Sequence, residues 1–275
     1  MSYIYHNIVP ELSDFVSCMI HIQQDSAMNK DIFYFHPATP QTGICFHFQD
    51  RITLYDSQTQ QFIKQPQTIV VGPQIRPVWL HSPGNYRTVR VGLLPGALYR
   101  LTGIPQNQLL DQGIDAELIF GSEIKVLNQA LLNSASPHCS LLLVEQFLKN
   151  QIANCKNQHH LDRVMRMLCS DIDFHGLDQL AMGSCLSTRQ FERICQQRIG
   201  MHPKLYHRII RFSRTFQMLE QGYSGTWTNL AYMNNYFDRQ HLKRDFKLFT
   251  GMNLFDLHME IQNTPFLIQG KLSYT

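Results

Sequence analysis

The spacing of hydrophobic residues divides the chain into two parts with different periods. Up to about residue 95, short apolar or alternating runs are separated by turn residues such as His36-Pro37 and Gly72-Pro73. Such runs predict β-strands. The predicted strands are Ile32–Phe35, Ile44–Phe48, Ile52–Tyr55, Thr68–Val71, Val78–Leu80 and Val89–Leu94. Many short strands at this spacing predict a small β-barrel or sandwich.

Beyond residue 95 the apolar residues recur every three or four positions, which is the period of an α-helix. Ile124, Leu127 and Leu131 form one such stripe, and a second runs through 141–152. The turn at 133–137 separates them, so we expect an αα-hairpin with one apolar face per helix. That face fits packing on the β-domain and also a homodimer seam through 124–152, and the sequence leaves both open.

The second half of the chain is helical throughout, with glycines at the breaks. The predicted helices are 160–170, 177–183, 187–198, 203–220, 227–233, 238–249 and 254–262. Pro203 suits a helix start, because the first turn leaves its backbone N–H groups unpaired. The polar stretch 150–160 fits a linker or a frayed helix end. We therefore expect an α+β protein with two domains, 1–155 (β-barrel plus helical hairpin) and 156–275 (all-α).

Composition excludes some classes of protein, and charge points toward a partner. The chain is 44% hydrophobic and 16% charged, which is typical of a globular protein. No apolar run approaches the ~18 residues of a membrane helix, so no membrane partner is expected. Residues 187–247 hold 11 Lys and Arg against four Asp and Glu, although the whole chain is only +3. A local basic surplus indicates a polyanion partner, with a solvated basic face as the alternative.

An internal repeat of about 50 residues lies within this basic region. Leu180-Ala181 and Leu230-Ala231 each open a unit, and a turn leads to a capping residue, Ser187 or Asp238. A helix follows in both units, and each unit closes on a glycine, Gly200 or Gly251.

This arrangement is the pattern of a helix-turn-helix, expected twice at about 177–199 and 227–249. The small Ala181 and Ala231 allow the two helices of a unit to approach closely. Ser187 and Asp238 suit the N-cap, and Asn235 tolerates a left-handed turn. Phe191 and Leu242 are expected to face the core. The connecting helix 203–220 spans about 27 Å at ~1.5 Å per residue, close to one turn of duplex at ~34 Å.

The second unit, from Ala231 through Asn235-Tyr236-Phe237-Asp238 to Lys247, resembles the signature of the AraC/XylS transcriptional regulators. The first unit, with Gly200 to Pro203, Tyr206 and Arg211, resembles the upstream half of the same signature. The match covers about 100 residues. Departures include Asn235 for the turn glycine, Leu242 for a phenylalanine and Leu254 for a proline.

The resemblance implies a tandem helix-turn-helix domain that binds double-stranded DNA in two successive major grooves. By motif position, the DNA-binding residues would be Thr188, Arg189, Glu192, Arg193, Arg239, Gln240, Lys243 and Arg244. Arginine suits guanine and Glu192 suits a cytosine amine, while Thr188 suits a phosphate. Contact with RNA polymerase is an implied further partnership, as for an activator.

The N-terminal half is similar to the cupin-like barrel of many such regulators, centred on Gly92-Leu93-Leu94-Pro95-Gly96. A small-molecule effector is the expected ligand, with His36, His47, Trp79 and Arg90 as candidate contacts. Histidines on barrel strands also fit a metal, but no tight H-x-H cluster is present, so neither a metal nor a cofactor is expected.

No catalytic motif of the GxSxG, P-loop or HExxH type is present, so we predict a regulator and not an enzyme. The rival interpretation is a cupin-type metal-dependent enzyme with a helical interaction module; an Ada-like alkyl-transfer protein is a third. The seven cysteines form no CxxC pair and the N-terminus lacks a signal-peptide pattern. We therefore expect reduced thiols and a cytoplasmic, nucleoid-associated protein.

Overall fold

The N-terminal part of the chain forms two antiparallel β-sheets. The structure, a computed structural model, describes residues 2–24, 31–56, 59–170 and 176–264. One sheet has the order β1-β2-β9-β4-β7-β10 and the other β3-β8-β5-β6. Their bounds are β1 Ser2–Tyr5, β2 Val16–Gln23, β3 Ile32–His36, β4 Gly43–His47, β5 Thr53–Asp56, β6 Gln61–Lys64, β7 Thr68–Val71, β8 Val78–Ser82, β9 Arg87–Leu93 and β10 Gly113–Asp115.

The predicted β-rich domain is confirmed, whereas the closed barrel is wrong. Within the described residues each sheet keeps two free edges, β1 and β10 in one and β3 and β6 in the other, so both sheets are open. In the segments that the structure describes, one isolated β-bridge, Thr39↔Gln74, lies outside the named strands. The sequence predicts strands but not which edges pair, because pairing depends on contacts far apart along the chain.

The larger sheet has two differently used faces, because successive side chains of a strand point to opposite sides. Ile44 and Phe46 of β4 are completely buried in the N-terminal core. Cys45 and His47, between and after them, line a cavity on the other face. Tyr34 on the smaller sheet lines the same cavity, so the two sheets enclose it.

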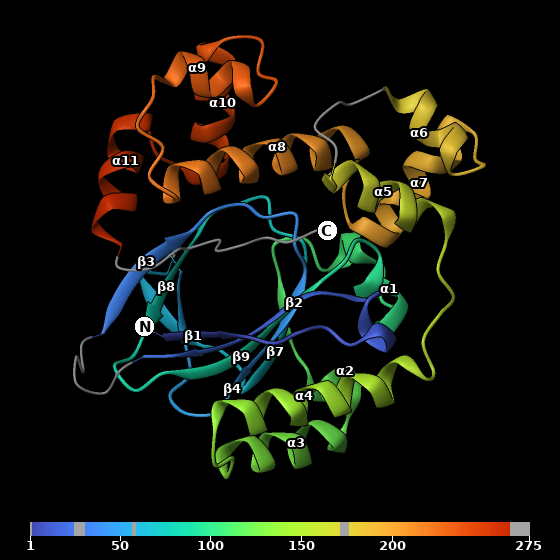
Figure 1. Cartoon of the computed structure of the whole chain (residues 1–275), viewed down its shortest axis with the longest axis vertical. Helices are drawn as coiled ribbons and strands as arrows, with labels where there is room; N and C mark the ends of the chain where they lie inside the picture. Colours follow the sequence, from blue (N-terminus) through green and yellow to red (C-terminus); the bar gives the residue numbers. More distant parts are fainter. Residues whose placement is uncertain (1, 25–30, 57–58, 171–175, 265–275) are drawn as a thin grey trace.

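The αα-hairpin covers the outer face of the larger sheet, as Figure 1 shows. It consists of α3 (Ser122–Leu132) and α4 (Pro137–Ile152), with Ser136 capping α4. Phe147 packs edge-on against Phe46 with ring centroids 6.1 Å apart. The predicted apolar stripes are buried in this contact: Ile124, Leu127, Leu131, Leu141, Val144 and Leu148. Packing on the β-domain is therefore confirmed.

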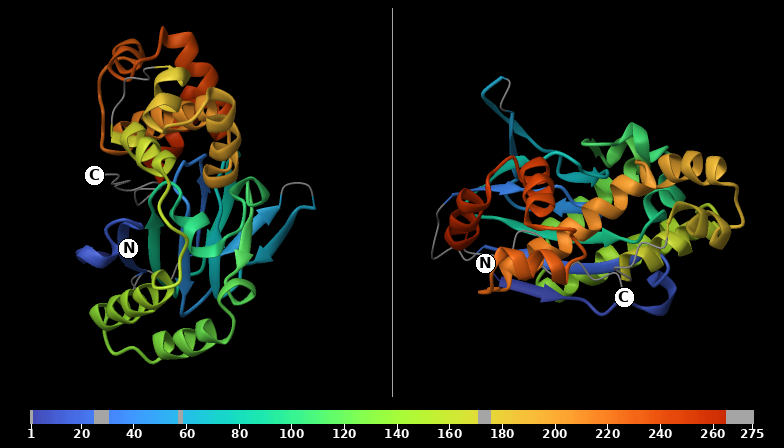
Figure 2. Two further views of the ribbon diagram at one scale, coloured as in Figure 1. Left: turned by 90° about the vertical axis from the view of Figure 1, so that its right-hand side faces the viewer. Right: turned by 90° about the horizontal axis from the view of Figure 1, so that it is seen from above.

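Short helices lie in the connections of the N-terminal part. The 3-10 helix η1 (Pro10–Leu12) lies between β1 and β2. The helix α1 (Ala97–Thr102), the 3-10 helix η2 (Gln106–Gln108) and the helix α2 (Glu117–Phe120) follow β9 and lead to the hairpin. Figure 2 shows the β5–β6 hairpin projecting from the side of the molecule. All four residues of β6 are exposed as a result.

The C-terminal part is helical, as predicted. Its helices are α5 His160–Ser170, α6 Leu177–Gly183, α7 Thr188–Ile199, α8 Pro203–Glu220, α9 Trp227–Met233, α10 Arg239–Thr250 and α11 Leu254–Asn263. The central α8 has 18 residues and carries Phe212, whose ring lies 4.9 Å from that of Phe246 and 5.2 Å from that of Phe249. None of the helices in the described segments has the length and apolarity needed to cross a membrane.

The smaller β-sheet contributes to the hydrophobic core of the C-terminal helices, which is separate from the N-terminal core. Phe35 of β3 and the adjoining Ala38 are fully buried in the same cluster as Phe216 of α8. The Ala38 backbone N–H donates to the Phe249 carbonyl oxygen at 3.1 Å. The helical part is therefore held against the smaller sheet and is not tethered by the linker alone.

Candidate functional site

The first helix pair, α6 and α7, is built by local turn and capping signals. Cys185 adopts a left-handed conformation (φ +56°) in the turn between the helices. The Ser187 side chain then accepts from the Gln190 backbone N–H, while the Gln190 side chain accepts from the Ser187 N–H at 3.1 Å. This reciprocal capping box fixes the start of α7. Phe191 is fully buried, as its spacing predicts.

The second pair, α9 and α10, repeats this construction. Asn235 takes the left-handed conformation expected of it (φ +55°). The Asp238 side chain caps α10 by accepting from the His241 N–H at 2.6 Å. Leu242 and Phe246 are fully buried, so the opposite face of α10 is turned outward.

The predicted DNA-binding residues gather on these outward faces. Six are exposed: Arg189 and Arg193 on α7, and Arg239, Gln240, Lys243 and Arg244 on α10. Glu192 and Thr188 are partly buried, and the Thr188 hydroxyl donates to the Asp178 carboxylate at 2.9 Å. The exposed groups are mostly guanidinium and amide groups that can donate hydrogen bonds in a fixed geometry.

Part of the basic surplus is used inside the fold. Asp245 of α10, only 1% exposed, accepts from Arg211 at 2.9 Å and from Arg208 at 2.7 Å, both on α8. Arg211 also donates to the Asn235 carbonyl oxygen at 3.2 Å and lies 4.1 Å from the centre of the Tyr236 ring. This buried cluster joins α8 to the turn and to α10, so it sets the direction of α10.

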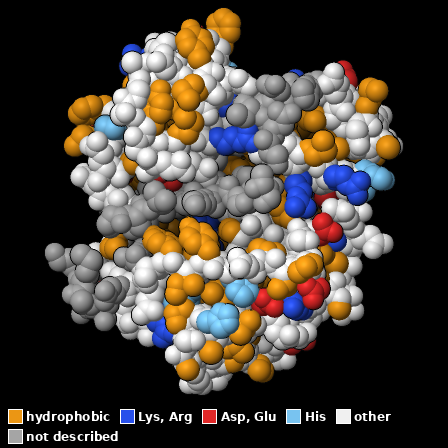
Figure 3. Space-filling view, in the orientation of Figure 1, with side chains coloured by type: hydrophobic (Ala, Val, Ile, Leu, Met, Phe, Trp, Pro, Cys, Tyr) orange, Lys and Arg blue, Asp and Glu red, His pale blue; other side chains and the backbone are white. Residues whose placement is uncertain are grey.

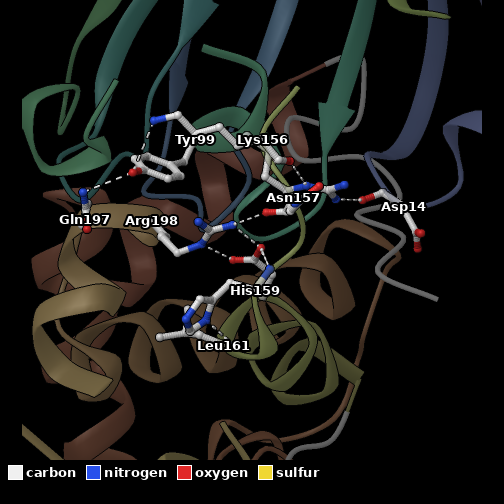
Figure 4. Close-up of polar contacts among 10 residues, drawn as sticks. Asp14, Tyr99, Lys156, Asn157, His159, Leu161, Gln197 and Arg198 are labelled. Carbon is white, nitrogen blue, oxygen red and sulfur yellow. Dashed lines mark hydrogen bonds and ion pairs between the residues drawn. The ribbon is translucent and has the colours of Figure 1, made fainter. Parts of the chain in front are cut away.

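The C-terminal end of α7 is clamped at the β-domain, as Figure 4 shows. Arg198, 8% exposed, donates to Asp162 of α5 at 2.6 Å and lies over the Tyr99 ring of α1 at 4.8 Å. Gln197 donates to the Tyr99 hydroxyl at 3.1 Å, and the Lys156 ammonium group lies 4.6 Å from the centre of the same ring. The ion pair with Asp162 and the contacts with Tyr99 thus hold the C-terminal end of α7 against α5 and α1.

The cavity between the sheets measures about 250 Å³ and is mainly apolar. Its polar groups include His36, His47, Gln41 and Arg90, with Arg90 donating to the Gln41 side-chain oxygen at 3.2 Å. Burial, reinforced by Arg90, lowers the pKa of His36 to about 3. Burial, reinforced by Arg51, lowers the pKa of His47 to about 4. Both imidazoles are therefore neutral near pH 7, and Arg90 is the cation among the lining residues that the structure describes.

Three of the four predicted effector contacts are brought together here, namely His36, His47 and Arg90. Trp79 lies on the opposite face of the smaller sheet, where it stacks on Phe33 with ring centroids 5.0 Å apart. Its strand neighbours Val78 and Leu80 line the cavity instead. Across the described segments, no group of three or more His, Cys, Asp or Glu side chains is arranged to hold a metal ion.

The segment 72–77 contacts both the cavity and the C-terminal ends of α7 and α10. Gln74 lines the cavity. Pro73 lies against Gly200, because a Cβ added to Gly200 would sit 2.5 Å from the Pro73 Cγ. A Cβ added to Gly251 would have the Pro77 Cγ as its neighbour, at 3.7 Å. Asp111 holds the segment by accepting from the Ile75 N–H at 2.7 Å. Sequence analysis missed this contact, because it depends on packing between distant residues.

Comparisons with known proteins bear on each part of the chain. Residues 9–115 match a family described as a domain of unknown function (DUF6597). No curated protein matches the sequence. A structure of an apo ToxT variant from Vibrio cholerae is 13% identical and covers 90% of this chain and 98% of its own, with a TM-score of 0.50.

Two further solved structures are similar. Wild-type ToxT from Vibrio cholerae with bound unsaturated fatty acid is 10% identical and covers 90% of this chain and 96% of its own, with a TM-score of 0.49. An AraC-type DNA-binding-domain regulator from Chromobacterium violaceum is 18% identical and covers 39% of this chain and 95% of its own, with a TM-score of 0.36. At these identities the comparison with apo ToxT shows a shared fold: an N-terminal β-sheet domain followed by C-terminal helices.

Proposed function

We propose that this chain is a transcriptional regulator of the AraC type, in which two helix-turn-helix units read double-stranded DNA. The β-domain would be residues 1–155 and the DNA-binding domain 156–275. The units would be α6–α7 and α9–α10, within about 177–199 and 227–249. The shared fold with ToxT supports this assignment.

The observation that carries the proposal is the matched construction of α7 and α10. Each follows a left-handed turn residue and a side-chain N-cap, buries one face, and exposes arginines on the other. A capped helix that presents guanidinium and amide groups outward fits a major groove. The 18-residue α8 between the units spans about 27 Å at ~1.5 Å per residue. This length is close to the ~34 Å of one turn of duplex, which supports the proposal that the two helices enter successive grooves on one face.

The proposed base readers are Arg189, Glu192 and Arg193 on α7, with Arg239, Gln240, Lys243 and Arg244 on α10. Thr188 is the proposed phosphate contact, and in the free chain its hydroxyl donates to Asp178.

Selection of duplexes from a random pool tests this function directly. The full-length chain should enrich sites with two conserved segments. Arg193→Ala and Arg244→Ala should each weaken binding by ~1–3 kcal/mol, or about 5- to 150-fold, and relax one base position. The control Lys125→Ala removes a charge on α3 and should leave binding unchanged. Equal affinity of the wild type for selected and random duplexes would refute the function.

The cavity is the proposed effector site. A mostly apolar wall with neutral histidines and the Arg90 guanidinium fits an apolar molecule that carries one acidic or hydrogen-bond-accepting group. ToxT has been solved with a molecule of this type, an unsaturated fatty acid, bound to it. Medium-chain carboxylates should raise the Tm of the wild type more than the matching alcohols do. Arg90→Gln should abolish that difference, and a flat response to both series would contradict the assignment.

A homodimer through 124–152 is the proposed assembly. The inner face of the αα-hairpin packs on the sheet, but Val126, Leu132 and Leu142 are 71%, 47% and 44% exposed. An apolar outer face on a hairpin favours self-association. Sedimentation should give a dimer for the wild type and a monomer for Val126→Asp, whereas a wild-type monomer at all concentrations would exclude this seam.

A further inference from the structure

The two turns differ in length by one residue at a defined point. The Leu186 N–H donates to the Ala181 carbonyl oxygen at 3.0 Å, and the Tyr236 N–H donates to Ala231 in the same way at 3.0 Å. After Leu186 the first unit passes directly to its N-cap, Ser187. After Tyr236 the second unit inserts Phe237 before its N-cap, Asp238. Phe237 therefore has no counterpart in the first unit.

The inserted side chain is turned outward. Phe237 is 86% exposed, which makes it the most exposed large hydrophobic side chain in the described part of the chain. Its neighbour Tyr236, by contrast, is only 2% exposed. The position contributes little to the core, so packing does not explain a phenylalanine here. Figure 3 shows hydrophobic side chains at the surface of the C-terminal part. Tyr232 and Met233 of α9 are also exposed, at 61% and 57%.

The position of Phe237 places it among the predicted readers. It directly precedes the N-cap of α10, and the exposed Arg239 and Gln240 follow within three residues. The N-terminal end of a recognition helix is the part that reaches base edges. A phenyl ring has no hydrogen-bonding group for a phosphate or a base amide. The apolar feature of a major groove is the C5-methyl group of thymine.

We propose that Phe237 is a specificity-determining residue that packs on a thymine methyl group beside the bases read by α10. This inference rests on the proposed DNA-binding function and refines it. The operator segment bound by the second unit then favours a thymine at one position, and the segment bound by the first unit has no equivalent preference.

Replacing thymine by uracil tests the contact, because it removes the methyl group and leaves every hydrogen-bonding group in place. Each thymine of a selected duplex is replaced singly, and binding of the full-length chain is measured. One position in the α10 segment should weaken wild-type binding about fourfold, which corresponds to the ~0.8 kcal/mol of one buried methyl group. With Phe237→Ala, the thymine and uracil duplexes should bind equally.

Matched variants separate this contact from other effects. Phe255 on α11 is 73% exposed, so Phe255→Ala removes a similar side chain outside the helix pairs and should keep the fourfold methyl dependence. Both variants should retain the wild-type Tm. The inference is overturned if no thymine methyl affects binding, or if the methyl dependence persists in Phe237→Ala, as expected for a ring that instead docks a protein. Failure to select any preferred duplex refutes the function itself, so the two failures are distinguishable.

Discussion

Asp245 ties α10 to α8, so Asp245→Asn tests how α10 is held in place. The carboxylate is 1% exposed and accepts one hydrogen bond from Arg211 and two from Arg208. The side chain of Arg211 is 9% exposed, whereas that of Arg208 is 41% exposed. The amide preserves the shape of the site and removes its negative charge. The variant therefore leaves one guanidinium buried without a counter-ion.

The expected loss follows from this difference in burial. Removing one partner of a buried ion pair costs ~3–5 kcal/mol. Arg208 can turn to water, and Arg211 keeps the Asn235 carbonyl oxygen and the Tyr236 ring. The lower end, about 3 kcal/mol, is therefore expected. At ~2–4 °C per kcal/mol for a chain of this size, the Tm should fall by about 6–12 °C.

Thermal unfolding followed by circular dichroism measures this shift. Asp50→Asn makes the same change at an exposed site and should alter stability by less than ~0.5 kcal/mol. The double variant Asp245→Leu with Arg211→Met removes both buried charges and should recover most of the loss. If Asp245→Asn lowers the Tm no more than Asp50→Asn does, the cluster does not hold α10 and the reasoning is wrong.

Two further predictions concern the cavity and the joint between the domains. Because burial lowers the folded-state pKa of His47 to about 4, its neutral form stabilises the fold above pH 6.5, and that stability is lost as the pH falls from 6.5 toward 4. Urea unfolding should show a pH slope in that window that is shallower for His47→Gln by up to ~1.4 kcal/mol per pH unit; an unchanged slope would contradict the burial argument. Gly200→Ala places a Cβ 2.5 Å from Pro73 Cγ at a φ of +94°, whereas Gly222→Ala pays only for its φ of +86° in open space. Gly200→Ala should therefore lower the free energy of unfolding by ~1–3 kcal/mol more than Gly222→Ala does. Equal losses would mean that the 72–77 segment moves aside without cost.

The helical half could be predicted closely because its boundaries are set by local chemistry. Ser187, Asp238 and Pro203 mark helix starts, and Gly200 and Gly251 mark ends, so the predicted helices match to within a residue. Cys185 escaped notice because cysteine carries no preference for the left-handed turn that it occupies.

The β-domain was predicted less completely. β2 was missed, because a register irregularity between Val16 and Cys18 breaks the alternation that identifies a strand. β6 was missed because it buries no face. Trp79 was assigned to the effector group, but strand alternation places it opposite to Val78 and Leu80, and the sequence does not say which set faces the cavity. The Asp245 cluster likewise depends on α8 and α10 being packed together.

The central claim is that α7 and α10 read one duplex at two places about one helical turn apart. Methylation interference on a selected duplex, measured with the full-length chain, tests it most directly. The account predicts two clusters of critical guanines with centres ~10 base pairs apart, one lost in Arg193→Ala and the other lost in Arg244→Ala. A single cluster, or two clusters that both variants affect alike, would contradict it.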